Sequence, residues 1–139
     1  GAWAANSVFA TSITKLIDGP RNAVFHIAFE GDGSGDLTDE VLIDPAESFD
    51  PALPATPGIT IDRLMYDLTG FDAKLEFDYL ASDTFIWSLT GDQYADVDLS
   101  QFGGLKDRSL QDGRGKLKIS TRGLGANETG VLIVKVRKD

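Results

Sequence analysis

Apolar and polar residues alternate along much of this chain, and helical periodicity is scarce. The clearest example is segment 73–79, where Leu75, Phe77 and Tyr79 are separated by charged residues. Successive side chains of a strand point to opposite faces of the sheet. The segment therefore predicts a strand with one buried face and one solvated face.

The same reasoning predicts strands elsewhere in the chain. Segment 116–121 alternates with its apolar residues inward, and segment 23–30 places Phe25, Ile27 and Phe29 on one face. Segment 131–136 is rich in β-branched residues, which is typical of a central strand. Further strands are expected at 8–17, 39–44, 59–68, 84–90 and 94–99.

Glycine, proline and aspartate separate these segments, and such residues favour turns. Short strands with this punctuation predict an all-β, single-domain jelly roll or β-sandwich of about eight antiparallel strands. Residues 1–7 are expected to form a flexible N-terminal arm, and residues 8–139 the domain. Met65–Gly70 resembles Ile86–Gly91, which we interpret as two similar strand ends rather than a duplication.

A proline-rich stretch interrupts the rhythm between the third and fourth predicted strands. Residues 45–57 contain four of the five prolines, which disfavours a central strand. We expect a long surface loop here, with one helical turn at 46–49.

Composition excludes several classes of site. The 139 residues include no cysteine, so disulfides, thiolate metal sites and cysteine nucleophiles are excluded. The net charge of −9 argues against binding to nucleic-acid phosphates. No apolar run approaches the roughly 20 residues of a membrane helix, and the first residues lack the features of a secretory signal, so no membrane partner is expected.

The charge is unevenly distributed. Residues 1–105 hold 18 acidic and 4 basic side chains, whereas residues 106–139 hold 9 basic and 4 acidic ones. One interpretation is that basic C-terminal strands lie beside acidic strands within one fold. The other is that this polarity orients the domain against a partner or a neighbouring copy.

Candidate catalytic and ligand sites are weak. Gly31–Asp36 resembles a calcium loop, but it lacks the closing glutamate of an EF-hand, and a solvated hairpin loop is expected instead. His26 is the only histidine and is expected on the polar face of its strand. We therefore expect no enzyme activity, cofactor or metal. Four aromatic residues offer an alternative sugar-stacking platform, although core positions are the usual place for such side chains: Tyr66, Tyr79, Trp87 and Tyr94.

Several segments, taken in order, resemble a known family. They are Ile17–Asn22, Val41–Asp44, Ile61–Tyr66, Leu75–Asp78, Phe102–Leu105, Gly115–Thr121 and the closing strand from Val131 to Lys138. In this order they resemble small virion structural proteins of tailed bacteriophages, of the type that decorate or cement the capsid shell. One departure is Phe77, where the family leads us to expect tryptophan; this change affects packing.

The resemblance implies a β-sandwich or jelly roll, often trimeric, that is made in the host cytoplasm and binds the outer lattice of major capsid protein. It implies a stabilising role without an active site. Alternatives are another virion component, such as a tail or head-fibre part, or a carbohydrate-binding module.

Three regions are predicted to contact the partner. The first is the N-terminal arm, through Trp3 and Phe9, because an arm can add a strand to a neighbour's sheet. The second is the proline-rich loop, with Phe49 and Leu53 as apolar anchors. The third is the basic segment 106–122, which includes Arg108 and Arg114.

Overall fold

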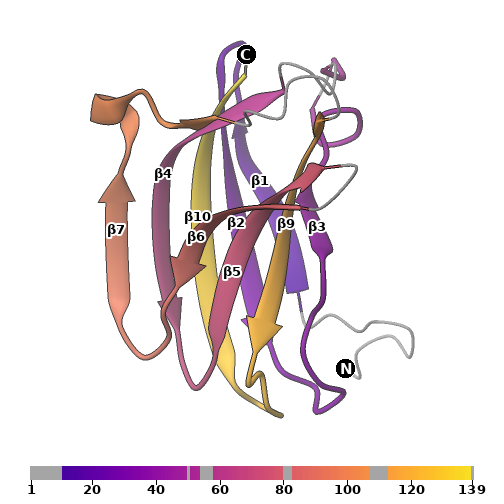
Figure 1. Ribbon diagram of the computed structural model, residues 1–139, viewed down its shortest axis with the longest axis vertical. Helices are drawn as coiled ribbons and strands as arrows, with labels where there is room; N and C mark the ends of the chain where they lie inside the picture. The colour runs from indigo at the N-terminus through magenta and orange to yellow at the C-terminus, as the bar shows by residue number, and fades with distance from the viewer. Residues whose placement is uncertain (1–10, 50, 54–57, 80–82, 107–112, 139) are drawn as a thin grey trace.

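The computed structural model describes residues 11–49, 51–53, 58–79, 83–106 and 113–138. Within these ranges the chain forms ten strands and one short 3-10 helix (Figure 1). The strands are β1 (Thr11–Asp18), β2 (Asn22–Glu30), β3 (Glu40–Ile43), β4 (Ile59–Leu68), β5 (Asp72–Tyr79), β6 (Thr84–Leu89), β7 (Tyr94–Asp98), β8 (Leu105–Lys106), β9 (Gly113–Arg122) and β10 (Thr129–Lys138). The 3-10 helix, η1 (Ser100–Phe102), connects β7 to β8. Every predicted strand is present in the described residues, and residues 8–10 of the strand predicted at 8–17 lie outside them.

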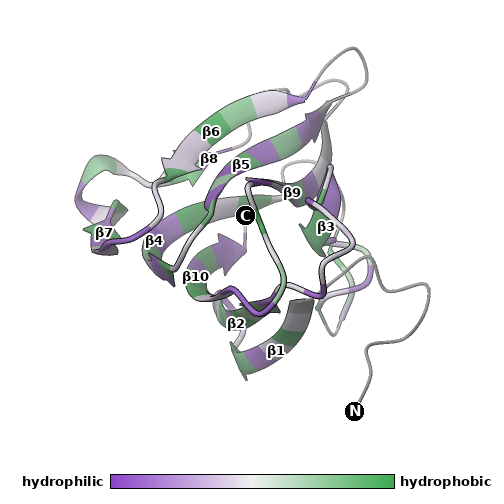
Figure 2. Ribbon diagram, turned by 90° about the horizontal axis from the view of Figure 1, so that it is seen from below, coloured by the Kyte–Doolittle hydropathy of each residue, from purple (hydrophilic) through white to green (hydrophobic). Residues whose placement is uncertain are grey.

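The strands form two antiparallel sheets that pack face to face (Figures 1 and 2). The larger sheet has the order β1-β2-β10-β4-β7, with β8 also paired to β4, and the smaller has the order β3-β9-β5-β6. The chain crosses between sheets at most connections, and its last strands insert between earlier ones. This arrangement is a jelly roll, to which β1 adds a further strand beside β2. The predicted fold class is confirmed.

Apolar faces of the two sheets form one core. In β2, Phe25, Ile27 and Phe29 are buried as predicted, while the residues between them, His26 included, are half-buried. The β10 side chains Leu132 and Val134 are fully buried, and this strand lies between β2 and β4. The prediction of a central strand at 131–136 is therefore confirmed.

The prediction that one face of β5 is solvated is wrong for two of its charged residues. Its Glu76 and Asp78 are buried, at 8% and 9% exposed. The reason is that β5 lies between β6 and β9, where long side chains from neighbouring strands cover it. One of them, Lys118 of β9, places its Nζ atom 3.0 Å from Oδ1 of Asp78. Alternation identified the strand but not the burial of its charged side.

The prediction of a hairpin loop for the glycine-rich segment between β2 and β3 is also wrong. The segment does not close a hairpin, because β2 and β3 belong to different sheets. The segment is anchored by Asp36, whose Oδ1 accepts hydrogen bonds from the Leu124 amide at 2.8 Å and the Thr121 hydroxyl at 3.0 Å. Leu37 beside it is 2% exposed. This connection therefore helps to hold the two sheets together.

The two similar strand ends meet in space. The carboxylate of Asp92 accepts a hydrogen bond from the Gly70 amide at 2.8 Å, and the Asp92 amide donates to the Leu68 carbonyl. A Cβ atom on Gly91 would lie 2.0 Å from the carbonyl oxygen of Phe71. Gly91 thus permits close backbone approach at one end of the sandwich, whereas Gly70 adopts a positive φ of 88°.

Asp36 should make acid stability depend on its charge. Burial raises the pKa of this carboxyl, but hydrogen bonds from the Leu124 and Gly123 amides and the Thr121 hydroxyl outweigh it and lower the pKa overall. A lowered folded pKa contributes stability above the unfolded value of about 3.9, and the contribution is lost as pH falls through the folded pKa.

We therefore expect Asp36→Asn to reduce the free energy of unfolding by about 1 kcal/mol at pH 7, a value limited by solvent screening. The difference from wild type should shrink below about pH 4, as measured by urea unfolding across pH. Asp67→Asn, at an exposed position of β4, is the control. A deficit independent of pH would contradict this role for the charge.

Candidate functional site at the β1 edge

Strand β1 is the most exposed strand of the larger sheet. Among the described strands it pairs only with β2, and each residue from 12 to 18 is exposed. Three of them are aliphatic: Ile13 at 43%, Leu16 at 55% and Ile17 at 55% exposed. An edge strand also presents backbone amide and carbonyl groups for pairing. We call these three side chains, with the open side of β1, the β1 edge. Figure 2 shows β1 next to β2 at the end of the larger sheet.

An irregularity in pairing with β2 shapes this edge. The register shifts between Lys15 and Ile17, which places Leu16 at a β-bulge. Two aliphatic side chains follow each other there instead of alternating with polar ones. The strand was predictable from the sequence, and its apolar patch was missed, although the lack of strict alternation at 16–17 was a signal for it.

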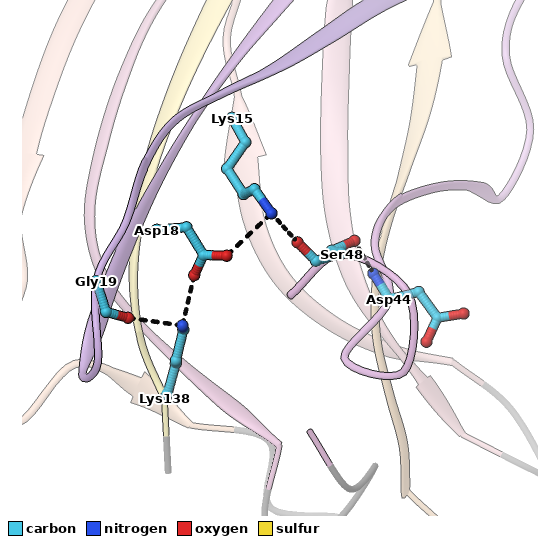
Figure 3. Close-up of polar contacts among 6 residues, drawn as sticks. All are labelled: Lys15, Asp18, Gly19, Asp44, Ser48 and Lys138. Atoms are coloured by element: carbon cyan, nitrogen blue, oxygen red, sulfur yellow. Dashed lines mark hydrogen bonds and ion pairs between the residues drawn. The ribbon is translucent and has the colours of Figure 1, made fainter. Parts of the chain in front are cut away.

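Charged groups fix the end of β1 to the rest of the domain (Figure 3). The Nζ atom of Lys15 lies 2.9 Å from Oδ2 of Asp18 and donates to the Ser48 carbonyl at 2.9 Å. Lys138, at the end of β10, donates to Oδ1 of Asp18 and to the Gly19 carbonyl. The Lys138 side chain is only 8% exposed, so these charge-assisted bonds are protected from water.

The loop after β3 packs against this cluster. Asp44 begins one turn, in which its carbonyl accepts hydrogen bonds from the Glu47 and Ser48 amides. The predicted helical turn is thus present as a single turn rather than a helix. The Leu53 amide donates to the Pro45 carbonyl at 2.8 Å, which brings the start of the loop close to residue 53.

Phe49 lies elsewhere than the sequence led us to expect. It is 5% exposed, and its ring meets that of Phe25 edge-on at 5.7 Å. Lys138 Nζ lies 5.0 Å from the centre of the Phe49 ring. Phe49 is therefore part of the core and not a surface anchor, because the loop folds it back over β2. Leu53 is half-buried and packs against the same core.

The remaining predicted contact residues are not placed. Trp3, Phe9 and Arg108 lie outside the described residues, and so does the side chain of Arg114. Within segment 106–122, several described basic side chains pair inside the domain. Lys116 lies 3.9 Å from Asp44. These ion pairs support the interpretation that basic C-terminal strands lie beside acidic ones.

The outer face of the smaller sheet carries an open groove of about 330 Å³. Its lining includes an aromatic ring, two cations and hydroxyl groups, from Asp72, Ala73, Lys74, Phe85, Ser88, Ser120, Thr121 and Arg122. Phe85 is 59% exposed. By contrast, Tyr66 is buried and Trp87 half-buried, with Trp87 Nε1 3.5 Å from the Tyr66 hydroxyl. Those two rings are therefore core residues and not an exposed platform.

Comparisons with known proteins add little to this description. No protein-family model matches the chain, and no curated protein matches it significantly. Among solved structures it resembles a cupin superfamily protein from Desulfitobacterium hafniense, 13% identical, covering 92% of this chain and 76% of that one with a TM-score of 0.33. It also resembles an RmlC-like cupin family protein with a double-stranded β-helix fold from Methanocaldococcus jannaschii, 7% identical, covering 96% and 84% with a TM-score of 0.34.

Within the described ranges, no helix has the length and apolar character needed to cross a bilayer.

Lys138 should control the attachment of β1. We expect Lys138→Met to remove the bonds to Asp18 and Gly19 and to accelerate hydrogen exchange of β1 amides at least about tenfold, equivalent to a bond of about 1.5 kcal/mol. Amides of β4 should change less. Lys135→Met, at an exposed position on the same strand, is the control. Unchanged β1 exchange in Lys138→Met would show that the cluster does not hold the strand.

Proposed function

We propose that this domain is a non-enzymatic virion structural protein that binds the outer lattice of a capsid and stabilises it, as a decoration or cement protein. The sequence resemblance supports this assignment across most of the chain. A jelly roll is the architecture which that resemblance implied, and it is compatible with the proposal without being specific to it.

The observation that carries the attachment mode is the apolar β1 edge. Leu16 and Ile17 are each 55% exposed on a strand that has an open side. Burying such side chains against a partner is favourable by about 25 cal/mol for each Å² of apolar surface removed from water. The backbone of the edge can also pair with a strand of the partner.

The N-terminal arm continues this edge along the sequence. Trp3 and Phe9 precede β1 directly, so an attachment at β1 extends naturally into them. The proline-rich loop contacts the same region through the bond from Lys15 to the Ser48 carbonyl. The proline-rich loop therefore adjoins the β1 edge, and the arm precedes this edge in the sequence. We propose that the β1 edge faces a capsid subunit.

Lattice binding explains stabilisation by mass action. A domain that binds only assembled subunits shifts the equilibrium toward the assembled state. Many copies, each with a modest interface, brace the shell together. Formation of a homotrimer would increase this effect, because linked binding sites act with a high effective concentration.

Two changes should weaken attachment. Replacing Leu16 and Ile17 with lysine should reduce co-sedimentation with purified, undecorated capsids at least tenfold, because charges cannot be buried there. Deleting residues 1–7 should weaken attachment without changing thermal unfolding. Phe102→Ser is the matched control, since Phe102 is 81% exposed beyond β7, at the other edge of the sheet.

Circular dichroism should first establish that each variant is folded. Wild-type binding by the Leu16→Lys/Ile17→Lys variant would overturn the β1 attachment mode. Equal loss in Phe102→Ser would show that the assay reports general surface hydrophobicity rather than this edge.

A carbohydrate-binding role is the second candidate, and the groove with Phe85 favours it. Exposed aromatic rings beside hydroxyl and charged groups are suited to stacking on sugars. A glycan array would test it, with loss of binding expected in Phe85→Ala. Absence of glycan binding by the wild-type protein would remove this candidate.

A further inference from the structure

Three carboxylates from separate segments converge above the smaller sheet. Asp39 precedes β3, Glu76 lies within β5 and Asp83 precedes β6. Each offers an oxygen atom that lies within 4.8 Å of those offered by the other two. We call Asp39, Glu76 and Asp83 the carboxylate cluster. Like charges at this distance repel one another unless a cation lies between them.

A buried oxygen atom supplies an independent indication. Glu76 is only 8% exposed, and its Oε1 atom has no hydrogen-bond donor among the described residues. The nearest cation is Lys74, whose Nζ is 3.6 Å away on a side chain that is 53% exposed. A buried carboxylate oxygen without a donor is costly, so a ligand that coordinates it would be strongly favoured.

Two lysine side chains border the carboxylate cluster: Lys74 beside Glu76 and Lys118 beside Asp83. Lys118 lies 3.0 Å from Asp78 and 3.3 Å from Asp83.

We propose that Asp39, Glu76 and Asp83 bind a divalent cation, and specifically Ca²⁺. All three donors are carboxylate oxygens, which hard cations prefer, and the cluster contains no nitrogen or sulfur ligand. Ca²⁺ accepts irregular sets of six to eight oxygens, and the exposed side of Asp39 leaves space for water ligands. Mg²⁺ requires near-ideal octahedral geometry, which three separate segments satisfy less readily.

The position of the cluster defines what the ion does. Strands β3 and β6 are the two edges of the smaller sheet, and β5 lies between them (Figure 1). A cation at the cluster would therefore tie both edges to an interior strand. This site is separate from the glycine-rich segment, where Asp32 accepts a hydrogen bond from the Ser34 amide and Asp36 from the Leu124 amide.

Calcium-dependent unfolding tests the proposal. The melting temperature of the full chain is measured in EDTA and in about 5 mM CaCl₂, with NaCl at matched ionic strength because the chain is strongly acidic. We expect Ca²⁺ to raise it by about 5 °C or more, and Mg²⁺ by less. Isothermal titration calorimetry with CaCl₂ should show one site.

Glu76→Gln is the decisive variant. It retains the size of the side chain and removes the charge, so it should fold in EDTA at least as well as wild type and lose the calcium response. Asp39→Asn, at an exposed position, should lose most of the response and covers the case in which Glu76→Gln does not fold. Asp32→Asn, outside the cluster, should retain it.

Three results would overturn the assignment: no Ca²⁺-specific shift in wild type, an equal shift with Mg²⁺, or a full calcium response in both Glu76→Gln and Asp39→Asn. Capsid attachment is measured separately, so failure here leaves that proposal standing.

Discussion

The insertion of β10 between β2 and β4 is the constraint on which the rest of this structure depends. The last strand completes the larger sheet and buries Leu132, Val134 and Val136 in the core. It also brings the end of the chain beside the end of β1, where Lys138 bonds to Asp18 and lies over the ring of Phe49. The pairing of β10 thus joins β2 to β4, and Lys138 at its end contacts both β1 and the proline-rich loop. Because this pairing joins distant parts of the sequence, it needs most of the chain in place before it forms.

The domain separates its chemistry onto different surfaces. The β1 edge is aliphatic, and charged groups at its end serve to hold the strand in place. The smaller sheet carries the carboxylate cluster and a groove with Phe85 on its outer face. The net charge of −9 is therefore distributed unevenly over the domain. Much of the basic C-terminal segment is used inside the fold, as in the pair of Lys118 with Asp78, and apolar attachment and cation binding are assigned to separate regions.

The sequence predicted the strands well because alternation and turn residues are local signals. It did not predict which strands pair, and so it missed the covered polar face of β5 and the anchoring role of Asp36. Phe49 was misplaced for a similar reason: its neighbours are prolines and polar residues, whereas its burial depends on Phe25 from a distant strand. The carboxylate cluster joins residues from three segments, and no spacing rule in the chain identifies it. At β1, the missing alternation at Leu16 and Ile17 was readable, but only the edge position gives it meaning.

Quantitative mass spectrometry of purified particles tests the central claim most directly, by counting copies of this chain for each copy of the major capsid protein. A decoration protein covers the lattice, so the account predicts a ratio near one or a simple fraction of one. A trace ratio would place the protein at a tail or a vertex. Complete absence from particles would contradict the virion assignment and leave the groove beside Phe85 as the surface to investigate.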